Sequence, residues 1–114
     1  MPIPYEELRQ RLEARRARML EEIDHIDLRT KNSLGYTNHQ ADDATYAEEQ
    51  ATNMALKQNV ERLLEQVDDA LQRLDEGTYG ICVRCGAEID PARLKALPYA
   101  PLCLDCQRRQ DLNL

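Results

Sequence analysis

Four cysteines near the C-terminus constrain the fold of this 114-residue chain more than any other feature. They form two Cys-x-x-Cys pairs that are separated by seventeen residues. This spacing is typical of a four-cysteine zinc site. Two such turns supply four thiolates and leave no open position on a tetrahedral metal, so we expect one structural Zn(II) ion per chain. Its ligands would be Cys82, Cys85, Cys103 and Cys106.

The segment around the cysteines has too few apolar side chains to fold on its own. Residues 78–107 hold only nine sizeable ones, and zinc binding worth about 10 kcal/mol or more could make up the deficit. Gly80 and Gly86 flank the first pair and would ease its tight backbone path. The net negative charge of a zinc tetrathiolate could be partly offset by nearby basic residues. These are Arg84, Arg93, Lys95, Arg108 and Arg109.

Two other uses of the cysteines stay open. They could form two disulfides or remain idle thiols, or one Cys-x-x-Cys pair could serve a thiol oxidoreductase. A redox pair of the thioredoxin type sits at the start of a helix in a βαβ setting, and no parallel-strand pattern is visible here. We therefore expect no catalytic residues and no enzyme.

The first half of the chain predicts a long helix that begins near Pro4. Glu6 and Glu7 would lie in its first turn, where the helix dipole favours negative charge. Apolar residues recur at near-heptad spacing, with Arg15 filling one slot; they are Tyr5, Leu8, Leu12, Met19, Ile23 and Ile26. The pattern stops in residues 31–40, KNSLGYTNHQ, which predicts a turn.

A second helix is predicted to begin between Asp42 and Thr45, since Thr45 and Glu48 match a capping box. Apolar residues then follow in alternating steps of four and three, which is a coiled-coil pattern. They are Leu56, Val60, Leu63, Val67, Ala70 and Leu74. Gly77 is placed to end this helix as a C-cap.

The two apolar series match each other if the chain folds back on itself. Facing positions in an antiparallel pair have numbers with a nearly constant sum, and here a sum of about 75 sets Leu8 against Val67. We therefore expect an intrachain hairpin in a monomer. Residues facing Ile23 and Ile26 would be polar, so the half nearer the turn should pack more loosely. The alternative is a coiled coil between chains.

Composition favours a mostly α protein. Charged residues make up 32% and hydrophobic residues 42%, and the only aromatic residues are five Tyr. The formal net charge of -6 argues against direct, sequence-specific DNA binding and favours a protein partner. The N-terminus lacks the apolar core of a secretory signal, and no apolar run is long enough to span a membrane. We expect a cytoplasmic protein.

The run EGTYGICVRCGAEIDPARLKALPYAPLCLDC resembles the C4-type zinc finger of the DksA/TraR family. A coiled-coil hairpin before the finger is a further hallmark of that family. The resemblance implies a coiled-coil hairpin over residues 1–77 with its tip near 33–45, a C4 zinc finger over 78–107 and a short tail over 108–114.

The resemblance also implies a function. Members of the family bind RNA polymerase, insert the hairpin into its secondary channel and thereby regulate transcription. The tip signature of the family is Asp-x-x-Asp-x-Ala, which matches residues 39–44, HQADDA. Asp42 and Ala44 keep the second Asp and the Ala, Asp43 adds a carboxylate, and His39 replaces the first Asp. Asp42 and Asp43 could equally cap the second helix, and His39 could be an ordinary surface residue.

Alarmone binding is not expected. The family's guanosine tetraphosphate site uses basic residues, whereas the aligned positions here hold the uncharged Gln66, Leu97 and Gln107, although Lys95 lies close by. Phosphate binding without a cation would be weak. The alternative to polymerase binding is a zinc-stabilised adaptor or stress-related interaction protein of the same fold.

Overall fold

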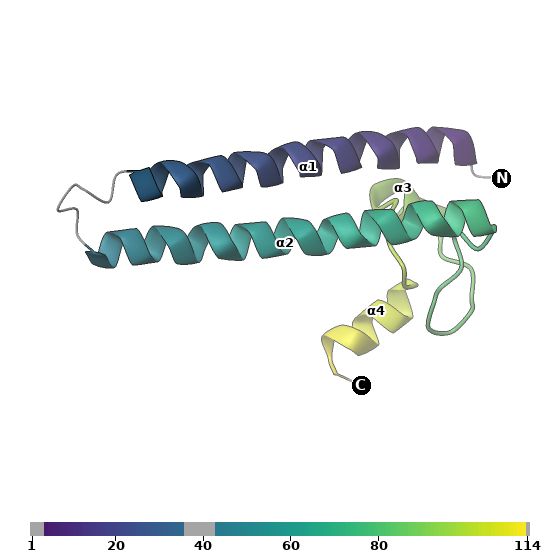
Figure 1. Ribbon diagram of the computed structural model, residues 1–114. Coiled ribbons are helices and arrows are strands. Elements are labelled where there is room, and N and C mark those ends of the chain that lie inside the picture. Colours follow the sequence, from purple (N-terminus) through teal and green to yellow (C-terminus); the bar gives the residue numbers. More distant parts are fainter. Residues whose placement is uncertain (1–3, 36–42, 114) are drawn as a thin grey trace. The chain divides into compact units, whose positions relative to one another are not determined.

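The helices of the hairpin and of the finger dominate the structure, a computed structural model that describes residues 4–35 and 43–113. Helix α1 spans Tyr5–Gly35, α2 spans Asp43–Glu76, α3 spans Pro91–Ala96 and α4 spans Leu104–Asp111 (Figure 1). Extended pairing within the described ranges is limited to one isolated antiparallel bridge, Ile81 with Glu88. The predicted mostly α class, with a helical hairpin followed by a four-cysteine finger, is confirmed.

Helix α1 begins where the sequence predicts and ends later. The N–H of Leu8 donates to the carbonyl of Pro4 at 3.0 Å, so the helical bonds start at that proline. Glu6 and Glu7 lie in the first turn. The helix then runs on to Gly35, through residues whose apolar pattern has already stopped. Periodicity reports which face packs, whereas backbone hydrogen bonds can continue without a packing partner, so the pattern ended before the helix.

Helix α2 agrees with the prediction at both ends. It begins at Asp43, within the predicted range of Asp42 to Thr45, and it ends at Glu76. Thr45 lies inside the helix, so the capping box predicted there is wrong. Gly77 has a φ of 78°. Its N–H donates to the Leu74 carbonyl at 3.4 Å, and the next N–H, of Thr78, donates to the Arg73 carbonyl at 2.9 Å. These two bonds form a Schellman motif, which satisfies carbonyls that the helix end would leave without partners.

The chain divides into two compact units, one of residues 1–16 with 65–114 and one of residues 17–64. The first contains the start of α1, the end of α2 and the finger; most of the buried apolar side chains belong to it. They are Leu8, Leu12, Val67, Ala70, Tyr79, Cys82, Ile89, Leu94, Ala100, Leu102 and Cys106. The boundaries predicted at residues 77 and 107 stay a prediction.

In the first unit, ion pairs join α1 to α2. Arg9 pairs with Asp75 at 2.8 Å and Arg16 with Asp68 at 2.6 Å. Since the higher number on α1 meets the lower on α2, the helices are antiparallel here. All four side chains keep substantial solvent exposure, so each pair contributes at most about 1 kcal/mol. The apolar contact stabilises the pair, and the ion pairs help to fix its register.

The second unit, residues 17–64, has a sparser interior. Among its described side chains, those of residues 17–30 and 45–64, the buried apolar ones are Met19, Ile26 and Val60. Leu56, which the apolar series placed in the seam, is 43% exposed. The ammonium of Lys57 pairs with the Asp27 carboxylate at 2.8 Å. This sparse set agrees with the expectation of looser packing nearer the turn.

The ion pairs have a constant register that differs from the predicted one. The position numbers add to 84 in each of the three pairs, compared with the predicted sum of about 75 for facing apolar residues. Helical side chains lean toward the N-terminus of their own helix. In an antiparallel pair, long polar side chains therefore meet partners beyond the position directly opposite. The pairing of the individual apolar residues stays a prediction.

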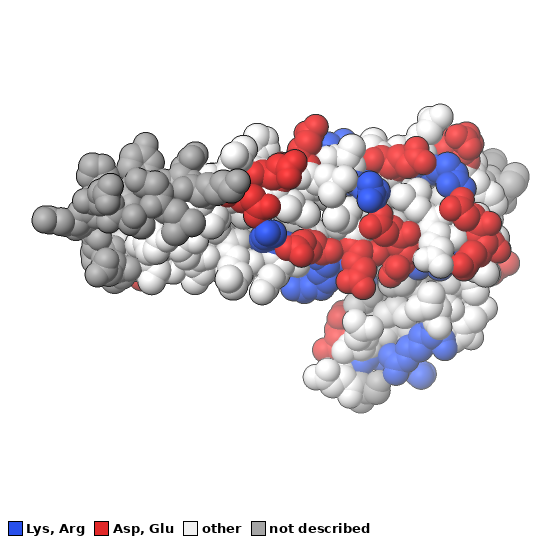
Figure 2. Space-filling view, viewed as in Figure 1, with Lys and Arg blue, Asp and Glu red and all other residues white. Residues whose placement is uncertain are grey.

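Acidic side chains are prominent on the surface of the helices. Figure 2 shows Asp and Glu along α1 and α2 on the face in view, with fewer Lys and Arg between them. Within residues 4–35 and 43–113, none of the helices combines the length and apolar character needed to cross a bilayer.

Candidate metal centre

The first cysteine pair lies in a tight reversal of the chain. The N–H of Cys82 donates to the Ala87 carbonyl at 2.8 Å, and the N–H of Gly86 donates back to the Cys82 carbonyl at 3.0 Å. Gly80 and Gly86 both have positive φ, 84° and 77°, a conformation that is costly for residues with a Cβ. The glycines thus permit the loop that turns Cys82 and Cys85 toward one point, as the sequence predicted.

The second pair lies at the start of α4. Cys103 is the N-cap residue of that helix, and its carbonyl accepts from the N–H of Gln107 at 2.9 Å. Cys106 follows within the first turn and is buried.

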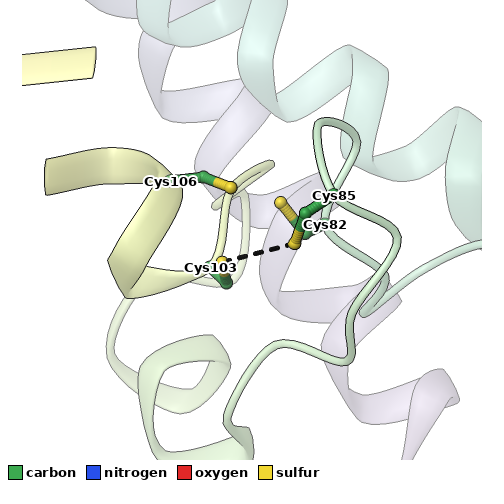
Figure 3. A group of neighbouring side chains, drawn as sticks. All are labelled: Cys82, Cys85, Cys103 and Cys106. Carbon is green, nitrogen blue, oxygen red and sulfur yellow. Dashed lines mark hydrogen bonds between the residues drawn. The ribbon is translucent and has the colours of Figure 1, made fainter. Parts of the chain in front are cut away.

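The four sulfur atoms converge on one point (Figure 3). All four Sγ atoms lie within 4.8 Å of one another, and Cys85 Sγ is 3.7 Å from Cys103 Sγ. A tetrahedral Zn–S bond of about 2.3 Å sets an S–S separation of about 3.8 Å, whereas a disulfide needs about 2.05 Å. The four cysteines are free thiols. The donor set and its dimensions fit one zinc ion with four thiolate ligands.

The pKa values of Cys82 and Cys106 are shifted in opposite directions. Burial raises the pKa of Cys82, but hydrogen bonds from the backbone at Cys103, Cys85 and Arg84 outweigh it and lower that pKa to about 6. Burial and the neighbouring thiols raise the pKa of Cys106 to about 12. Backbone hydrogen bonds thus stabilise the Cys82 thiolate, whereas burial and the neighbouring thiols oppose the ionisation of Cys106. A divalent cation bound among the sulfurs would relieve that opposition.

One side of the cluster is more open to solvent than the other. Cys82 and Cys106 are buried, Cys103 is half-buried and Cys85 is exposed. One cysteine of each pair is therefore part of the finger's interior. Removal of the metal would leave these two thiols in a core that has few other groups.

The tyrosine of the Tyr-Gly pair before the first cysteine, Tyr79, also fixes the finger. Tyr79 is 5% exposed, and its hydroxyl donates to the Pro98 carbonyl at 2.8 Å. Burial raises the pKa of Tyr79 to about 12. The Tyr5 ring meets the Tyr79 ring edge-on, with centroids 5.9 Å apart. Tyr5, which the apolar series placed in the hairpin seam, is 55% exposed and contacts the finger.

Two arginines of α1 bind the finger segment that contains α3. Arg11 Nη2 donates to the Lys95 carbonyl at 3.1 Å, and the Arg15 guanidinium lies 5.3 Å from the centre of the Tyr99 ring. The sequence placed Arg15 in the hairpin seam, in a slot of the apolar series. The interruption of that series by a charged residue is a signal that could have indicated a contact outside the seam. Nothing in the sequence marks Arg11 in the same way.

One of the basic residues of the finger, Arg93, makes a hydrogen bond to the backbone next to a cysteine ligand. Arg93 Nε donates to the Leu102 carbonyl at 3.0 Å, just before the second cysteine pair. For Arg84, Lys95, Arg108 and Arg109, compensation of the site's negative charge stays a prediction.

A cavity of about 260 Å³ in the first unit brings together the three residues that the sequence comparison predicted to align with the alarmone site of the family. Gln66 of α2, Leu97 and Gln107 all line it. The premise that no cation is present is wrong, because Arg93 also lines the cavity. One donor of that side chain is already used, because Nε donates a hydrogen bond to the Leu102 carbonyl.

The predicted tip falls largely outside the described residues. His39 and Asp42 lie in the segment between α1 and α2 that the structure does not describe. Asp43 and Ala44 are the first two residues of α2, where the backbone alone is described. The role of these four residues therefore stays a prediction.

The fold and the site define a protein with a helical hairpin and a C4-type zinc finger. The family model of the prokaryotic dksA/traR C4-type zinc finger matches residues 77–111. The chain belongs to the DksA/TraR family, and the four-cysteine site is the zinc site of its finger.

Relatives match well beyond the finger. General stress protein 16O of Bacillus subtilis is 38% identical over 89 residues, which cover 78% of this chain and 51% of that protein. An uncharacterised protein of Aquifex aeolicus is 36% identical over 108 residues, 89% of this chain and 72% of that protein. The RNA polymerase-binding transcription factor DksA of Escherichia coli is 28% identical over 102 residues, 90% of this chain and 68% of that protein. The chain thus spans about half the length of the stress protein.

A solved structure agrees with this relationship. The transcription factor DksA2 of Pseudomonas aeruginosa superposes with a TM-score of 0.84 at 28% identity. The match covers 96% of this chain and 84% of that one. The likeness includes the helices before the finger as well as the finger itself.

Proposed function

We propose that this protein is a transcription regulator that binds RNA polymerase and inserts its hairpin into the secondary channel. The observation that carries the proposal is the likeness to two transcription factors along nearly the whole chain. DksA, named as RNA polymerase-binding, matches over 90% of this chain, and DksA2 matches in structure over 96% of it.

The chemistry of the site supports a regulator rather than an enzyme. Four thiolates saturate a tetrahedral zinc ion, so no position remains for water or substrate. The metal then has a structural role, and the protein acts through contacts. The net charge of -6 favours a protein partner over direct DNA binding. We place this activity in the cytoplasm, with the protein acting as a monomer.

The tip residues provide the functional contact in this proposal. Asp42 and Asp43 precede Ala44 in the sequence, and their carboxylates suit a site near a divalent metal ion or a mobile catalytic element. His39 stands in place of the first acid of the family signature, so an imidazole replaces a carboxylate at that position of the sequence. The competing role is local, since acids at the start of α2 also stabilise that helix.

In vitro transcription with purified polymerase tests the role of the tip. Asp42→Asn combined with Asp43→Asn is expected to abolish the effect on initiation while binding changes little. The matched control is Glu21→Gln with Asp24→Asn, two exposed acids of α1 with the same change in charge. An equal loss with the control pair, or full activity of the tip variant, would contradict the assigned role.

A second candidate is an adaptor or stress-related interaction protein that does not act on RNA polymerase. The observation that favours it is the 38% identity to general stress protein 16O, whose name refers to stress and not to polymerase. Absence of binding between the zinc-loaded chain and its cognate polymerase would favour this candidate.

A further inference from the structure

We propose that Arg93 is a positioning residue for the zinc site, which holds the backbone before Cys103 so that the second cysteine pair meets the first. This inference concerns the zinc site itself and does not depend on polymerase binding. It starts from a hydrogen bond of the Arg93 side chain, which runs from Nε to the Leu102 carbonyl at 3.0 Å.

The carbonyl that Arg93 contacts belongs to the residue immediately before a cysteine ligand. Leu102 is buried and directly precedes Cys103, the N-cap residue of α4. Cys103 has extended backbone angles, φ −68° and ψ 167°, and no side-chain hydrogen bond caps this helix. The direction in which α4 leaves, and with it the position of Cys106, therefore depends on how the residues before Cys103 are fixed.

Two adjacent carbonyls fix that segment from different parts of the finger. Val83, between the two cysteines of the first pair, donates its N–H to the Pro101 carbonyl at 2.9 Å. Arg93, on α3, donates to the next carbonyl, of Leu102. The first bond ties the two cysteine pairs to each other, and the second ties α3 to both. Without Arg93, a carbonyl in a buried part of the chain would lose its partner.

An arginine suits this position for two reasons. Its planar guanidinium holds Nε in a fixed direction, which a flexible ammonium cannot do. Its charge also lies among residues next to the ligands, because Arg93 lines the same cavity as Val83, Leu102 and Gln107. A cation there opposes the net negative charge that four thiolates leave on the zinc ion. Outer groups that orient metal ligands typically change metal affinity by roughly 10–100-fold when they are removed.

The test is zinc transfer from the full chain to excess 4-(2-pyridylazo)resorcinol, followed by absorbance. Arg93→Met keeps the alkyl stem and removes the hydrogen bond and the charge; we expect it to release zinc roughly 10–100-fold faster. Arg18→Met is the matched control. It makes the same substitution at an exposed residue of α1, outside the finger. The control is expected to release zinc at the wild-type rate.

A second readout separates positioning from general destabilisation. In the Co(II)-substituted chain, a shifted d–d absorption envelope in Arg93→Met, with unchanged helical circular dichroism, is the expected signature of displaced thiolates. A wild-type Co(II) spectrum would overturn the proposal, and so would a wild-type release rate.

Arg93→Lys provides a further variant if Arg93→Met does not fold. It keeps the charge and loses the fixed Nε–H, and we expect a release rate between those of the wild type and Arg93→Met. Release from Arg93→Lys at the wild-type rate would show that the directed hydrogen bond is unimportant and would also overturn the proposal.

Discussion

The guanidinium of Arg15 lies over the ring of Tyr99, 5.3 Å from its centre. Arg15 belongs to the first turns of α1 and Tyr99 to the finger, so residues far apart in the sequence meet in one compact unit. Together with the bond from Arg11 to the Lys95 carbonyl, this contact joins the hairpin base to the zinc-binding segment. The finger and the base of the hairpin are thus parts of one structure in the first unit.

Loss of the Arg15–Tyr99 contact should destabilise the chain measurably. A half-buried cation over an aromatic ring contributes about 0.5–2 kcal/mol, and we expect Arg15→Met to lower the free energy of unfolding in urea by that amount. Arg18→Met, at an exposed position one turn later, is the control and should cost less. A double-mutant cycle with Tyr99→Leu isolates the pair; a coupling energy of zero would contradict the contact.

The hydroxyl of Tyr79 should lose its proton at a higher pH than that of an ordinary tyrosine. Burial raises the pKa of Tyr79 in the folded state from its ordinary value of about 10 to about 12. The folded state therefore keeps its proton where the unfolded chain loses it. The contribution of Tyr79 to stability is fully present below pH 10 and is lost as the pH rises from 10 through 12, by up to about 3 kcal/mol.

Ultraviolet titration of tyrosinate measures this directly. One of the five tyrosines should titrate about two pH units late, and Tyr79→Phe should remove that component. The same substitution leaves the Pro98 carbonyl without its donor, which should cost about 1 kcal/mol. If all five tyrosines titrate together near pH 10 in the folded protein, Tyr79 is not buried as described.

Removal of zinc should unfold the finger. Residues around the cysteines have few other buried groups, and structural zinc contributes about 10 kcal/mol or more in small finger peptides. We expect one zinc per chain by elemental analysis, and four thiols that react with a thiol reagent only after chelation or denaturation. Cys106→Ser, which removes a buried ligand, should lose zinc. Retention of a native circular dichroism spectrum and melting temperature after complete chelation would contradict the structural role of the metal.

Guanosine tetraphosphate should bind weakly, if the aligned positions decide its affinity. Gln66, Leu97 and Gln107 line one cavity without providing a charge, and the remaining cation there, Arg93, is held by the Leu102 carbonyl. Calorimetric titration of the polymerase complex is therefore expected to show no more alarmone binding than polymerase alone. Additional binding that depends on Arg93 would reverse this expectation and give that arginine a second role.

The features that the sequence predicted correctly depend on local rules. The two Cys-x-x-Cys pairs fix the metal site because four thiolates at this spacing can meet on one ion. Helix α2 could be predicted because its apolar residues recur in steps of four and three, which is the repeat of a packed helix face. Its end could be predicted because Gly77 readily adopts the positive φ of a C-cap. Such rules need no knowledge of which segments meet.

The features that were missed depend on tertiary contacts or on segments too short for periodicity. Helix α3 has six residues, although Asp90 accepts from the Ala92 N–H at 2.9 Å and Pro91 follows it, a start signal that is visible in the sequence. The hydrogen bond from Tyr79 to Pro98 and that from Arg93 to Leu102 carry no such signal. Each joins residues that lie 19 or 9 positions apart in the sequence and that only the tertiary fold brings together.

Equilibrium binding of the labelled, zinc-loaded chain to its cognate RNA polymerase tests the proposed function most directly. We expect saturable binding that unlabelled chain displaces and that prior chelation of the zinc abolishes. No binding of the intact, zinc-loaded chain to that polymerase would contradict the account.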